Sequence, residues 1–276
     1  MGLKIIVSHD IDHWRWSDHL TKDTFLAKYI ARIGLLWLSG RLDSRIAFQR
    51  MLLLRKAEQH CLAELIDFNN QRGVPATFFL GVANGLSLSY SLETSAEIVH
   101  WLRERGVDRI GIHGIAFDDP AGIAEERRRF ESIAASADFG IRMHYLRNSD
   151  RTLQLLTEAG YSFDSTTYGI RAPYFVDGML EFPVSVMDGR LLSMGRNDMS
   201  FVKRQTLKNL RDAEESRAGY FTINFHDVYF SAAFPDHFEW YVWLIDHLVE
   251  HGYEFTDFLQ ARSELLSGSI VPHPAD

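Results

Sequence analysis

The chain has 276 residues, a formal net charge of −8, 46% hydrophobic residues and a single cysteine. The acidic charge argues against nucleic acid or an anionic membrane as the main partner, and one cysteine excludes an intrachain disulfide. No apolar run approaches the ~20 residues of a membrane-spanning helix. Because the first residues also lack a signal-peptide pattern, we expect a cytoplasmic protein that does not span a membrane.

The first predicted element is a short buried strand, Leu3–Val7, followed at once by Ser8-His9-Asp10-Ile11-Asp12-His13. Two carboxylates and two imidazoles in six residues repel or titrate one another unless a positive charge holds them. The stretch fits a divalent-metal site with a neighbouring general base. It fits equally well a solvated strand end with a helix-capping aspartate, because Asp and His are common at loop tips.

Two long helices are predicted next, so that residues 18–72 form a helical insertion after the first strand. The first helix, Asp18–Leu38, has apolar residues at three-to-four spacing and ends in the nearly all-apolar run Ile33–Leu38. We expect this run either to cover one end of the domain or to form a homodimer interface. The second helix is predicted to run from the capping pair Asp43-Ser44 to Arg72.

From Val74 onward, strand-like and helix-like segments alternate. Predicted strands are Val74–Leu80, Arg109–Ile112, Gly140–Tyr145, Tyr161–Phe163, Glu181–Val186, Tyr220–Phe225 and Tyr253–Phe255. Predicted helices are Glu93–Arg105, Pro120–Ala137, Asp150–Ala159, Lys203–Ser216, Pro235–His251 and Thr256–Leu266. This alternation predicts an α/β fold with a mostly parallel sheet. Seven or eight strands favour a closed or nearly closed barrel over an open doubly wound sheet. Residues 1–267 are expected to form a single domain and 268–276 a flexible tail.

Polar residues follow several of the predicted strands. In a parallel barrel the carboxyl ends of the strands meet at one face, and functional residues lie there. The candidates are Asp10, Asp12, His13, His113, Arg142, His144, Asp164, His226 and Asp227. A lone histidine after a strand is more often structural than functional. Several strand ends that supply Asp, His and Arg together are harder to explain in that way, and they favour a site.

Five short motifs occur along the chain in a recognisable order. They are Ser8-His9-Asp10-Ile11-Asp12, Ala76-Thr77-Phe78-Phe79, Ile110-Gly111-Ile112-His113-Gly114, Arg142-Met143-His144-Tyr145 and Asn224-Phe225-His226-Asp227. Their order resembles the polysaccharide deacetylases, carbohydrate esterase family 4 with the NodB-homology fold, over Leu3 to about Leu259. The resemblance implies a distorted (β/α)7 barrel that removes N- or O-acetyl groups from sugars with a divalent metal.

Position within these motifs implies a role for each matching residue. Asp10 would be the general base and Asp12 a metal ligand, and His113 matches the first histidine of the two-histidine metal motif. The second histidine of that motif would fall at Phe117, which cannot bind a metal. The sequence therefore departs from the family pattern at one metal ligand.

Three residues are candidates for the missing ligand. We rank His144 first, because it ends a neighbouring strand and offers a neutral ring nitrogen. Asp118 ranks second, since a further carboxylate would weaken the Lewis acidity of the ion, and His13 would need a sharp turn after Asp12. A site with two ligands or no metal ranks last. Nitrogen and oxygen ligands suit zinc best, although iron, cobalt, nickel and manganese accept them too.

Two segments compete for the family's third motif, Arg-x-Pro-Tyr. Arg171-Ala172-Pro173-Tyr174 matches the motif at every fixed position. Arg142-Met143-His144-Tyr145 has His in place of Pro, but it is followed by the expected helix and by Gly160-Tyr161. We prefer Arg142, which the resemblance implies would orient the base Asp10. The Tyr145 amide would then help to bind the oxyanion.

The remaining roles concern the leaving group and the substrate. His226 matches the general acid, and Asp164 resembles its acidic partner, which would keep the imidazole protonated. Arg147 or Arg171 would hold the substrate. The sequence thus predicts a metal-dependent hydrolase that removes an acetyl group from an amino sugar or glycan precursor. Two rivals are a catalytically degenerate sugar-binding protein and a metal-dependent hydrolase of a C–N bond in a non-sugar substrate.

Overall fold

The computed structural model describes residues 2–19, 24–54, 61–134, 136–195 and 198–268. Within them, one sheet contains strands β1 (Lys4–Ile11), β2 (Ala76–Leu80), β5 (Ile110–Gly114), β6 (Ile141–Met143), β7 (Phe163–Asp164), β8 (Tyr174–Val176), β9 (Met179–Glu181), β10 (Val184–Met187), β11 (Tyr220–Asn224) and β12 (Glu254–Thr256). The order is β10-β11-β1-β2-β5-β6-β7-β9-β8, with β12 beside β1. A separate short hairpin joins β3 (Asn84–Gly85) to β4 (Leu88–Ser89).

Strand β1 lies at the centre of this sheet. Along one edge it pairs in parallel with β11, and along the other it pairs first with β12 and then with β2. Ile5, Ile6 and Val7 are fully buried, as expected for a parallel strand covered on both faces. Their β-branched side chains also favour extended backbone. The acidic motif therefore lies at the end of a strand that is buried from Ile5 to Ile11.

The sheet curls because the chain after β7 runs beside β10. The amide of Val184 donates to the Thr167 carbonyl at 2.8 Å, and the amide of Gly169 donates to the Val184 carbonyl at 3.1 Å. A parallel bridge also joins Tyr168 to Val184. This contact brings together two regions that lie far apart along the sheet order. The fold is thus a distorted, mostly parallel α/β barrel, as the sequence predicts.

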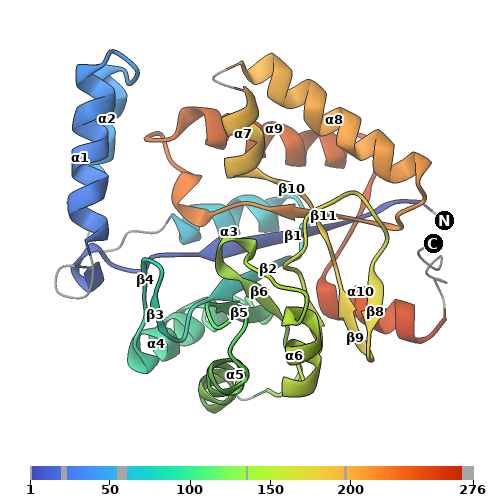
Figure 1. Ribbon diagram of the computed structural model, residues 1–276. Coiled ribbons are helices and arrows are strands. Elements are labelled where there is room, and N and C mark those ends of the chain that lie inside the picture. Colours follow the sequence, from blue (N-terminus) through green and yellow to red (C-terminus); the bar gives the residue numbers. More distant parts are fainter. Residues whose placement is uncertain (1, 20–23, 55–60, 135, 196–197, 269–276) are drawn as a thin grey trace.

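Helices cover the sheet on both sides (Figure 1). The described α-helices that follow residue 60 are α3 (Leu62–Gln71), α4 (Leu92–Arg103), α5 (Pro120–Ala134), α6 (Thr152–Ala159), α7 (Asp188–Gly195), α8 (Met199–Glu215), α9 (Pro235–Glu250) and α10 (Phe258–Leu266). Helices α7, α8 and α9 lie above the sheet in Figure 1, and α4, α5 and α6 lie below it. Trp240, Tyr241 and Leu244 of α9 are fully buried in the main core.

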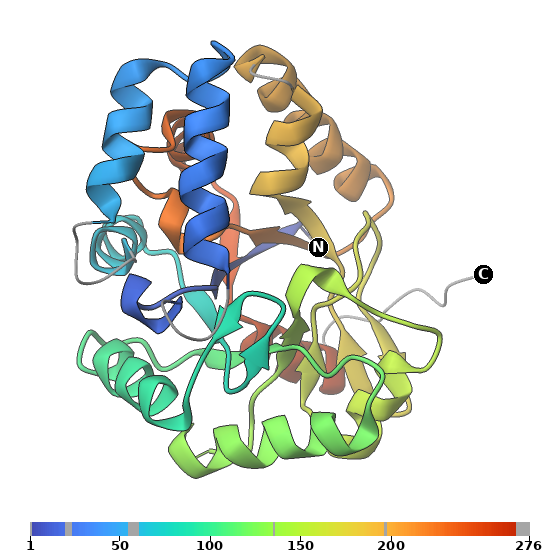
Figure 2. The same cartoon turned by 60° about the vertical axis from the view of Figure 1, so that its left-hand side comes forward.

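Helices α1 (Phe25–Leu38) and α2 (Ser44–Leu53) form a hairpin that stands beside the barrel (Figures 1 and 2). Gly40 adopts a φ of +68° at the turn, a conformation that glycine reaches at little cost. The Asp43 side chain then caps α2 by accepting from the amides of Arg45 and Ile46. Only Ile33 of α1 is buried, so most of the predicted apolar run is exposed. A homodimer interface on this face stays a prediction.

Several predicted elements differ from the observed ones. The predicted second helix corresponds to α2 and α3, and residues 55–60 between them lie outside the described part. The predicted strand Glu181–Val186 is split into β9 and β10 around Pro183, which has no N–H to donate to a sheet. The hairpin β8–β9 was not predicted, although its turn, Asp177-Gly178, is a strong hairpin signal. The predicted tail falls on 269–276, which are not described.

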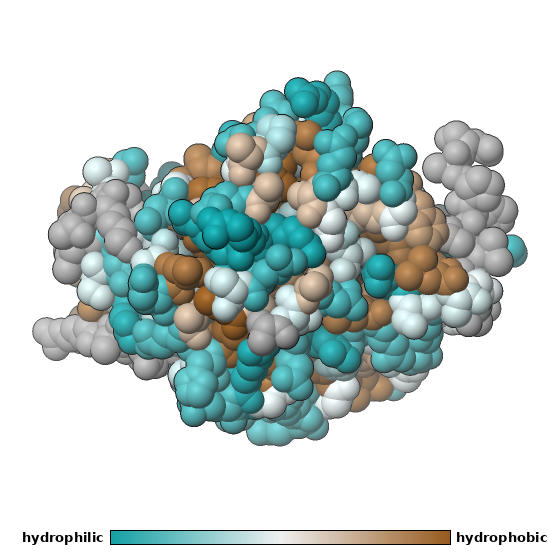
Figure 3. Space-filling view, turned by 90° about the horizontal axis from the view of Figure 1, so that it is seen from below, coloured by the Kyte–Doolittle hydropathy of each residue, from teal (hydrophilic) through white to brown (hydrophobic). Residues whose placement is uncertain are grey.

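Most charged side chains of α5 form pairs near the surface, but Glu126 is buried and accepts from the amides of Ile115 and Ala116. Glu125 pairs with Arg129 at 2.8 Å and with Arg128 at 2.5 Å, and Arg127 pairs with Glu131 at 2.7 Å. The underside of the molecule is correspondingly mostly hydrophilic (Figure 3). None of the described helices is long and apolar enough to cross a membrane.

Candidate active site

Side chains from three neighbouring strand ends form a compact cluster. Asp12 follows β1, His113 lies in β5, and His144 follows β6. One oxygen of Asp12 and one ring nitrogen of each histidine lie within 4.8 Å of one another. These three residues include the substitute ligand that ranked first from the sequence. The parallel sheet brings them together because β1, β2, β5 and β6 are consecutive in its order.

Hydrogen bonds to backbone carbonyls fix which ring nitrogens face the cluster. His113 Nδ1 donates to the Arg142 carbonyl at 3.1 Å, and His144 Nε2 donates to the Leu86 carbonyl at 3.1 Å. A carbonyl oxygen can only accept, so these two nitrogens carry the protons. In neutral imidazoles the other nitrogens, His113 Nε2 and His144 Nδ1, are then bare acceptors, and they lie 2.9 Å apart.

The third member of the cluster is also an acceptor. Asp12 Oδ1 is buried without a hydrogen-bond partner among the described residues. It lies 3.2 Å from His113 Nε2 and 3.6 Å from His144 Nδ1. Three lone pairs that face one another without a hydrogen between them repel, and a cation would remove that repulsion.

The donor set fits a divalent metal. Metal–ligand distances of about 2.1 Å place tetrahedral ligands ~3.4 Å apart, close to the spacing of these atoms. Burial, followed by the neighbouring His113, lowers the pKa of His144 to about 4, so this imidazole is neutral at pH 7. Burial opposes the charge on Asp12, but the His113, His226 and His144 imidazoles hold its pKa well below the usual value. Two imidazoles and one carboxylate leave room for water, as in catalytic zinc sites.

Asp10 lies beside the cluster and is held from two sides. Arg142 donates from one guanidinium nitrogen to Asp10 Oδ1 at 2.8 Å, and Asn224 donates to Asp10 Oδ2 at 2.7 Å. Burial alone would raise the pKa of Asp10, but the Arg142 charge lowers it to about 2. Asp10 is therefore an anion, 3.9 Å from His113 Nε2 and 3.9 Å from His226 Nε2.

Arg142 is itself fully buried and fully engaged. Its side chain also donates to Ser8 Oγ at 2.8 Å and to the backbone carbonyl and hydroxyl of Ser165, both at 3.0 Å. The structure thus places Arg142, and not Arg171, against Asp10. Arg171 instead donates to the Tyr174 hydroxyl at 3.1 Å in β8.

The partner of His226 is Asp188, and the prediction of Asp164 is wrong. His226 Nδ1 lies 2.9 Å from Asp188 Oδ1, and the His226 amide donates to Asp188 Oδ2 at 2.7 Å. Asp188 directly follows β10, the neighbour of β11, whereas Asp164 belongs to β7. The Asp164 carboxylate accepts from the Thr166 hydroxyl at 2.6 Å. Burial and the nearby Glu181 raise the pKa of Asp164 well above its usual value.

His226 carries a proton that it can donate. Burial alone would lower its pKa, but the Asp188 carboxylate raises the pKa of His226 to about 10. The opposite nitrogen, Nε2, faces Asp12 Oδ2 at 3.8 Å and Asp10 Oδ2 at 3.9 Å. A protonated imidazole therefore lies next to the anion Asp10 and the metal-ligand cluster.

The lower-ranked metal ligands lie outside the cluster. Asp118 is exposed and accepts from the Ser149 hydroxyl at 3.2 Å. The His13 ring packs against the Phe25 ring, with 4.1 Å between their centroids. At the position of the family's second histidine, the Phe117 ring lies 4.0 Å beneath the Arg147 guanidinium.

Strained backbone surrounds the cluster. Leu86 and Ser87, in the β3–β4 turn, have φ values of 52° and 74°, and Tyr145 and Leu146 have 58° and 51°. Non-glycine residues rarely adopt this left-handed conformation, which concentrates at functional sites. Here the strained turn presents the Leu86 carbonyl to His144, and Tyr145 lies beside the cavity next to Asp12.

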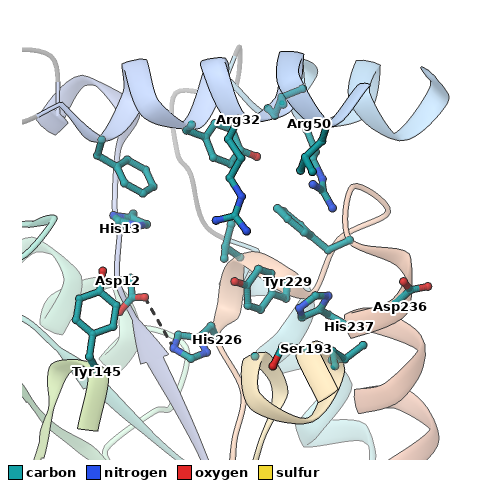
Figure 4. Close-up of a pocket in the computed structure, with 18 of the residues that line it drawn as sticks. Asp12, His13, Arg32, Arg50, Tyr145, Ser193, His226, Tyr229, Asp236 and His237 are labelled. Carbon is teal, nitrogen blue, oxygen red and sulfur yellow. Dashed lines mark ion pairs between the residues drawn. The ribbon is translucent and has the colours of Figure 1, made fainter. Parts of the chain in front are cut away.

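A cavity of about 560 Å³ opens above the cluster, a size typical of small-molecule sites. Its floor carries Asp12, Tyr145 and His226, and its roof is formed by side chains of α1 and α2 (Figure 4). Neither Arg147 nor Arg171 is among the described residues that line it. The structure therefore gives no support to their predicted role in substrate binding.

Sequence reasoning missed two polar partners of the site. Asp188 was overlooked because the predicted strand ended at Val186, although an acidic residue directly after a strand and before a helix was a usable signal. Asn224 lies in a quoted motif but points inward from β11 to Asp10. Only the strand order could show that these two residues face Asp10 and His226.

No family model and no curated protein matches the sequence. Solved structures do match the fold along its whole length. A protein described as a polysaccharide deacetylase from Mycobacterium smegmatis is 16% identical with a TM-score of 0.60, covering 100% of this chain and 95% of its own. A protein similarly described from Pseudomonas aeruginosa PAO1 is 15% identical with a TM-score of 0.61, covering 99% and 92%.

The PuuE allantoinase is also similar, at 14% identity and a TM-score of 0.62, covering 99% of this chain and 91% of its own. Identities this low compare folds and not activities. These matches agree with the curled α/β sheet. The chain therefore has the fold of the polysaccharide deacetylases.

Proposed function

We propose that the protein is a metal-dependent hydrolase that removes an acetyl or similar acyl group from an amino sugar or glycan precursor. The observation that carries this proposal is the set of three bare acceptor atoms on Asp12, His113 and His144. It lies directly beside an anion, Asp10, and an imidazolium, His226. Lewis-acid site, base and acid are the three parts that amide hydrolysis requires.

Each part would act on a different atom of the reaction. Asp12, His113 and His144 would hold a divalent cation, zinc being the best fit, and this ion would polarise the acyl carbonyl and acidify the attacking water. Asp10 would take the proton of that water, since Arg142 and Asn224 fix its carboxylate in place. His226 would donate a proton to the leaving nitrogen, and Asp188 would maintain the supply by keeping the imidazole charged.

The backbone at Tyr145 would complete the site. Its left-handed φ of 58° directs the chain sharply after His144, and its side chain lines the cavity with Asp12. We propose its amide as a donor to the oxygen that becomes negative during attack, as expected of an oxyanion site.

A turnover screen tests the function. The protein is freed of metal with a chelator, reloaded with zinc, iron, cobalt, nickel or manganese, and incubated with N-acetylated amino sugars. Released acetate is measured. We expect metal-dependent release from at least one sugar. Metal binding without release from any sugar or amide would instead identify a catalytically degenerate sugar-binding protein.

A second candidate function has one observation in its favour. The fold matches the PuuE allantoinase as well as it matches the deacetylases. The same screen therefore includes simple amides and allantoin. If one of these compounds is turned over faster than every acetylated sugar, the substrate is a non-sugar compound with a C–N bond. The proposed roles of the residues would stay unchanged.

A further inference from the structure

Two arginines from the helical insertion point into the cavity opposite the metal-ligand cluster. Arg32 extends from α1 and Arg50 from α2, and Figure 4 shows both guanidinium groups reaching down toward Tyr229 and His237. Asp12 and His226 lie on the floor of the same cavity. A single small molecule in this space could contact both ends.

Within the described part of the chain, Arg32 and Arg50 face the cavity without a carboxylate at ion-pair distance, and Asp236 lines the same cavity and acts on the Arg50 charge from further away. Among the residues that the structure describes, no ion pair involves Arg32 or Arg50. Arg50 instead donates to the Ala233 carbonyl at 3.1 Å, and its guanidinium lies 4.5 Å above the Phe234 ring. Burial, with a smaller contribution from the Arg32 charge, lowers the pKa of Arg50.

A third donor, Tyr29, lies three residues before Arg32 in α1. The hydroxyl of Tyr29 is buried, and no described residue forms a hydrogen bond with it. Tyr29 lines the same cavity, and burial raises the pKa of its hydroxyl to about 12, so it is an un-ionised O–H donor. A buried hydroxyl without a partner is unfavourable unless a ligand satisfies it.

Most of the remaining lining around these donors is apolar, although Asp236 and His237 also line the cavity. Trp16, Phe25, Ile33, Leu36 and Phe234 surround the donors. Among the described lining residues, Arg32 and Arg50 are the arginine or lysine side chains, so an anion in the upper cavity would find positive charge at these two groups. A guanidinium group suits this task, because its planar donors match the oxygens of a phosphate or carboxylate in pairs. Two like charges that face one cavity would gain further from an anion between them.

We propose that Arg32, Arg50 and Tyr29 form a subsite for an anionic group, a phosphate or a carboxylate, that the acylated sugar carries away from its acyl group. This inference rests on the proposed function, since the acyl group of such a ligand would lie on the cavity floor. The insertion after β1 would then select charged sugars, and the barrel would carry out the chemistry.

Calorimetry with matched probes tests the subsite. Metal-loaded protein with Asp10→Asn, which prevents turnover, is titrated with N-acetylglucosamine, with N-acetylglucosamine 1-phosphate and with the corresponding uronic acid. We expect at least one anionic sugar to bind about tenfold or more tightly than the neutral sugar, as one charge-assisted hydrogen bond provides. Whichever of the two binds better identifies the anion as phosphate or carboxylate.

Added substitutions assign that preference to residues. Arg32→Gln should remove most of it, and Arg32→Lys should retain part. Arg50→Gln should also remove most of the preference. Because Arg50 additionally donates to the Ala233 carbonyl, its loss could disturb the structure, and Arg32→Gln is therefore the cleaner test. Arg45→Gln, an exposed arginine of α2 outside the cavity lining, is the matched control and should change nothing.

The outcomes separate this inference from the proposed function. Equal binding of neutral and anionic sugars, or an anion preference that survives Arg32→Gln, would overturn the subsite. An Arg32-dependent anion preference, together with a wild-type protein that hydrolyses none of the probes, would support the subsite and count against hydrolysis. Turnover of neutral sugars alone, without any anion preference in binding, would support hydrolysis and overturn the subsite.

Discussion

The floor and the roof of the cavity are built in opposite ways. Beneath the floor, Arg142 is 0% exposed and Asp10 is 2% exposed, and the Asp10 carboxylate is fixed by Arg142 and Asn224. On the roof, Leu35 is 69% and Leu38 is 77% exposed, and Arg32 has no ion-pair partner among the described residues. The floor is pre-organised for chemistry, whereas the roof keeps its binding groups free for a ligand.

The largest expected effect is on turnover at the floor. Asp10→Asn removes the proposed proton acceptor without removing a metal ligand, so activity should fall by about 100- to 10,000-fold while metal stays bound. Acetate release and metal content are measured on the same preparation. Asp12→Asn is the control, and it should lose metal. The reverse pattern, with metal lost from Asp10→Asn and kept by Asp12→Asn, would exchange the two roles.

The next effect concerns stability and contrasts two arginines. Arg142→Met leaves the buried carboxylate of Asp10 without its counter-charge, which should reduce the free energy of unfolding by about 3–5 kcal/mol. Arg32→Met on the roof breaks no ion pair with a residue that the structure describes, so its effect should stay within ~0.5 kcal/mol. Urea unfolding measures both. Equal losses in the two variants would show that the floor and the roof do not differ as described.

A smaller effect separates the two candidate partners of His226. The pKa of His226 is raised to about 10 by Asp188, so the stabilisation from this pair is present at neutral pH and is lost as the pH rises through about 10. Asp188→Asn should lower the pKa toward the usual value of about 6.5. NMR titration of the imidazole in metal-free protein measures it. Asp164→Asn, the control, should leave the titration unchanged, and a shift there would restore Asp164 as the partner.

The sequence was informative where function depends on single strand ends. Asp10, Asp12, His113, Arg142, His144 and His226 all follow or end strands, and the barrel brings these six together. Their proximity follows from parallel strands, whose carboxyl ends share one face. His144 could be ranked above Asp118 because it ends the strand beside that of His113.

The rest of the site depends on which strands lie side by side in the sheet. No local sequence pattern encodes that order. Asp164 and Asp188 both follow short strands, but only β10 lies beside β11. The cavity was equally hidden, because its lining combines Arg32 and Arg50 of the insertion with residues of α7 to α9, more than 130 positions further along the chain. Periodicity predicted the helices of the insertion but not the cavity that they close.

The smallest effect is expected on the outer face of the roof. Leu35→Glu replaces a side chain that is 69% exposed, so the free energy of unfolding should change by no more than ~0.5 kcal/mol. Urea unfolding is combined with light scattering, which measures the mass in solution. A loss of several kcal/mol, or a fall in mass, would show that a second copy of the chain buries this face.

The central claim is that Asp12, His113 and His144 together bind a divalent metal, and calorimetric titration with zinc tests it most directly. The metal-free wild type should bind one equivalent. His144→Ala should weaken binding by at least about 100-fold, more than the loss of a group that only orients a ligand. Asp118→Ala and His13→Ala should bind as the wild type does. Wild-type affinity in His144→Ala, or no binding by the wild type itself, would contradict the account.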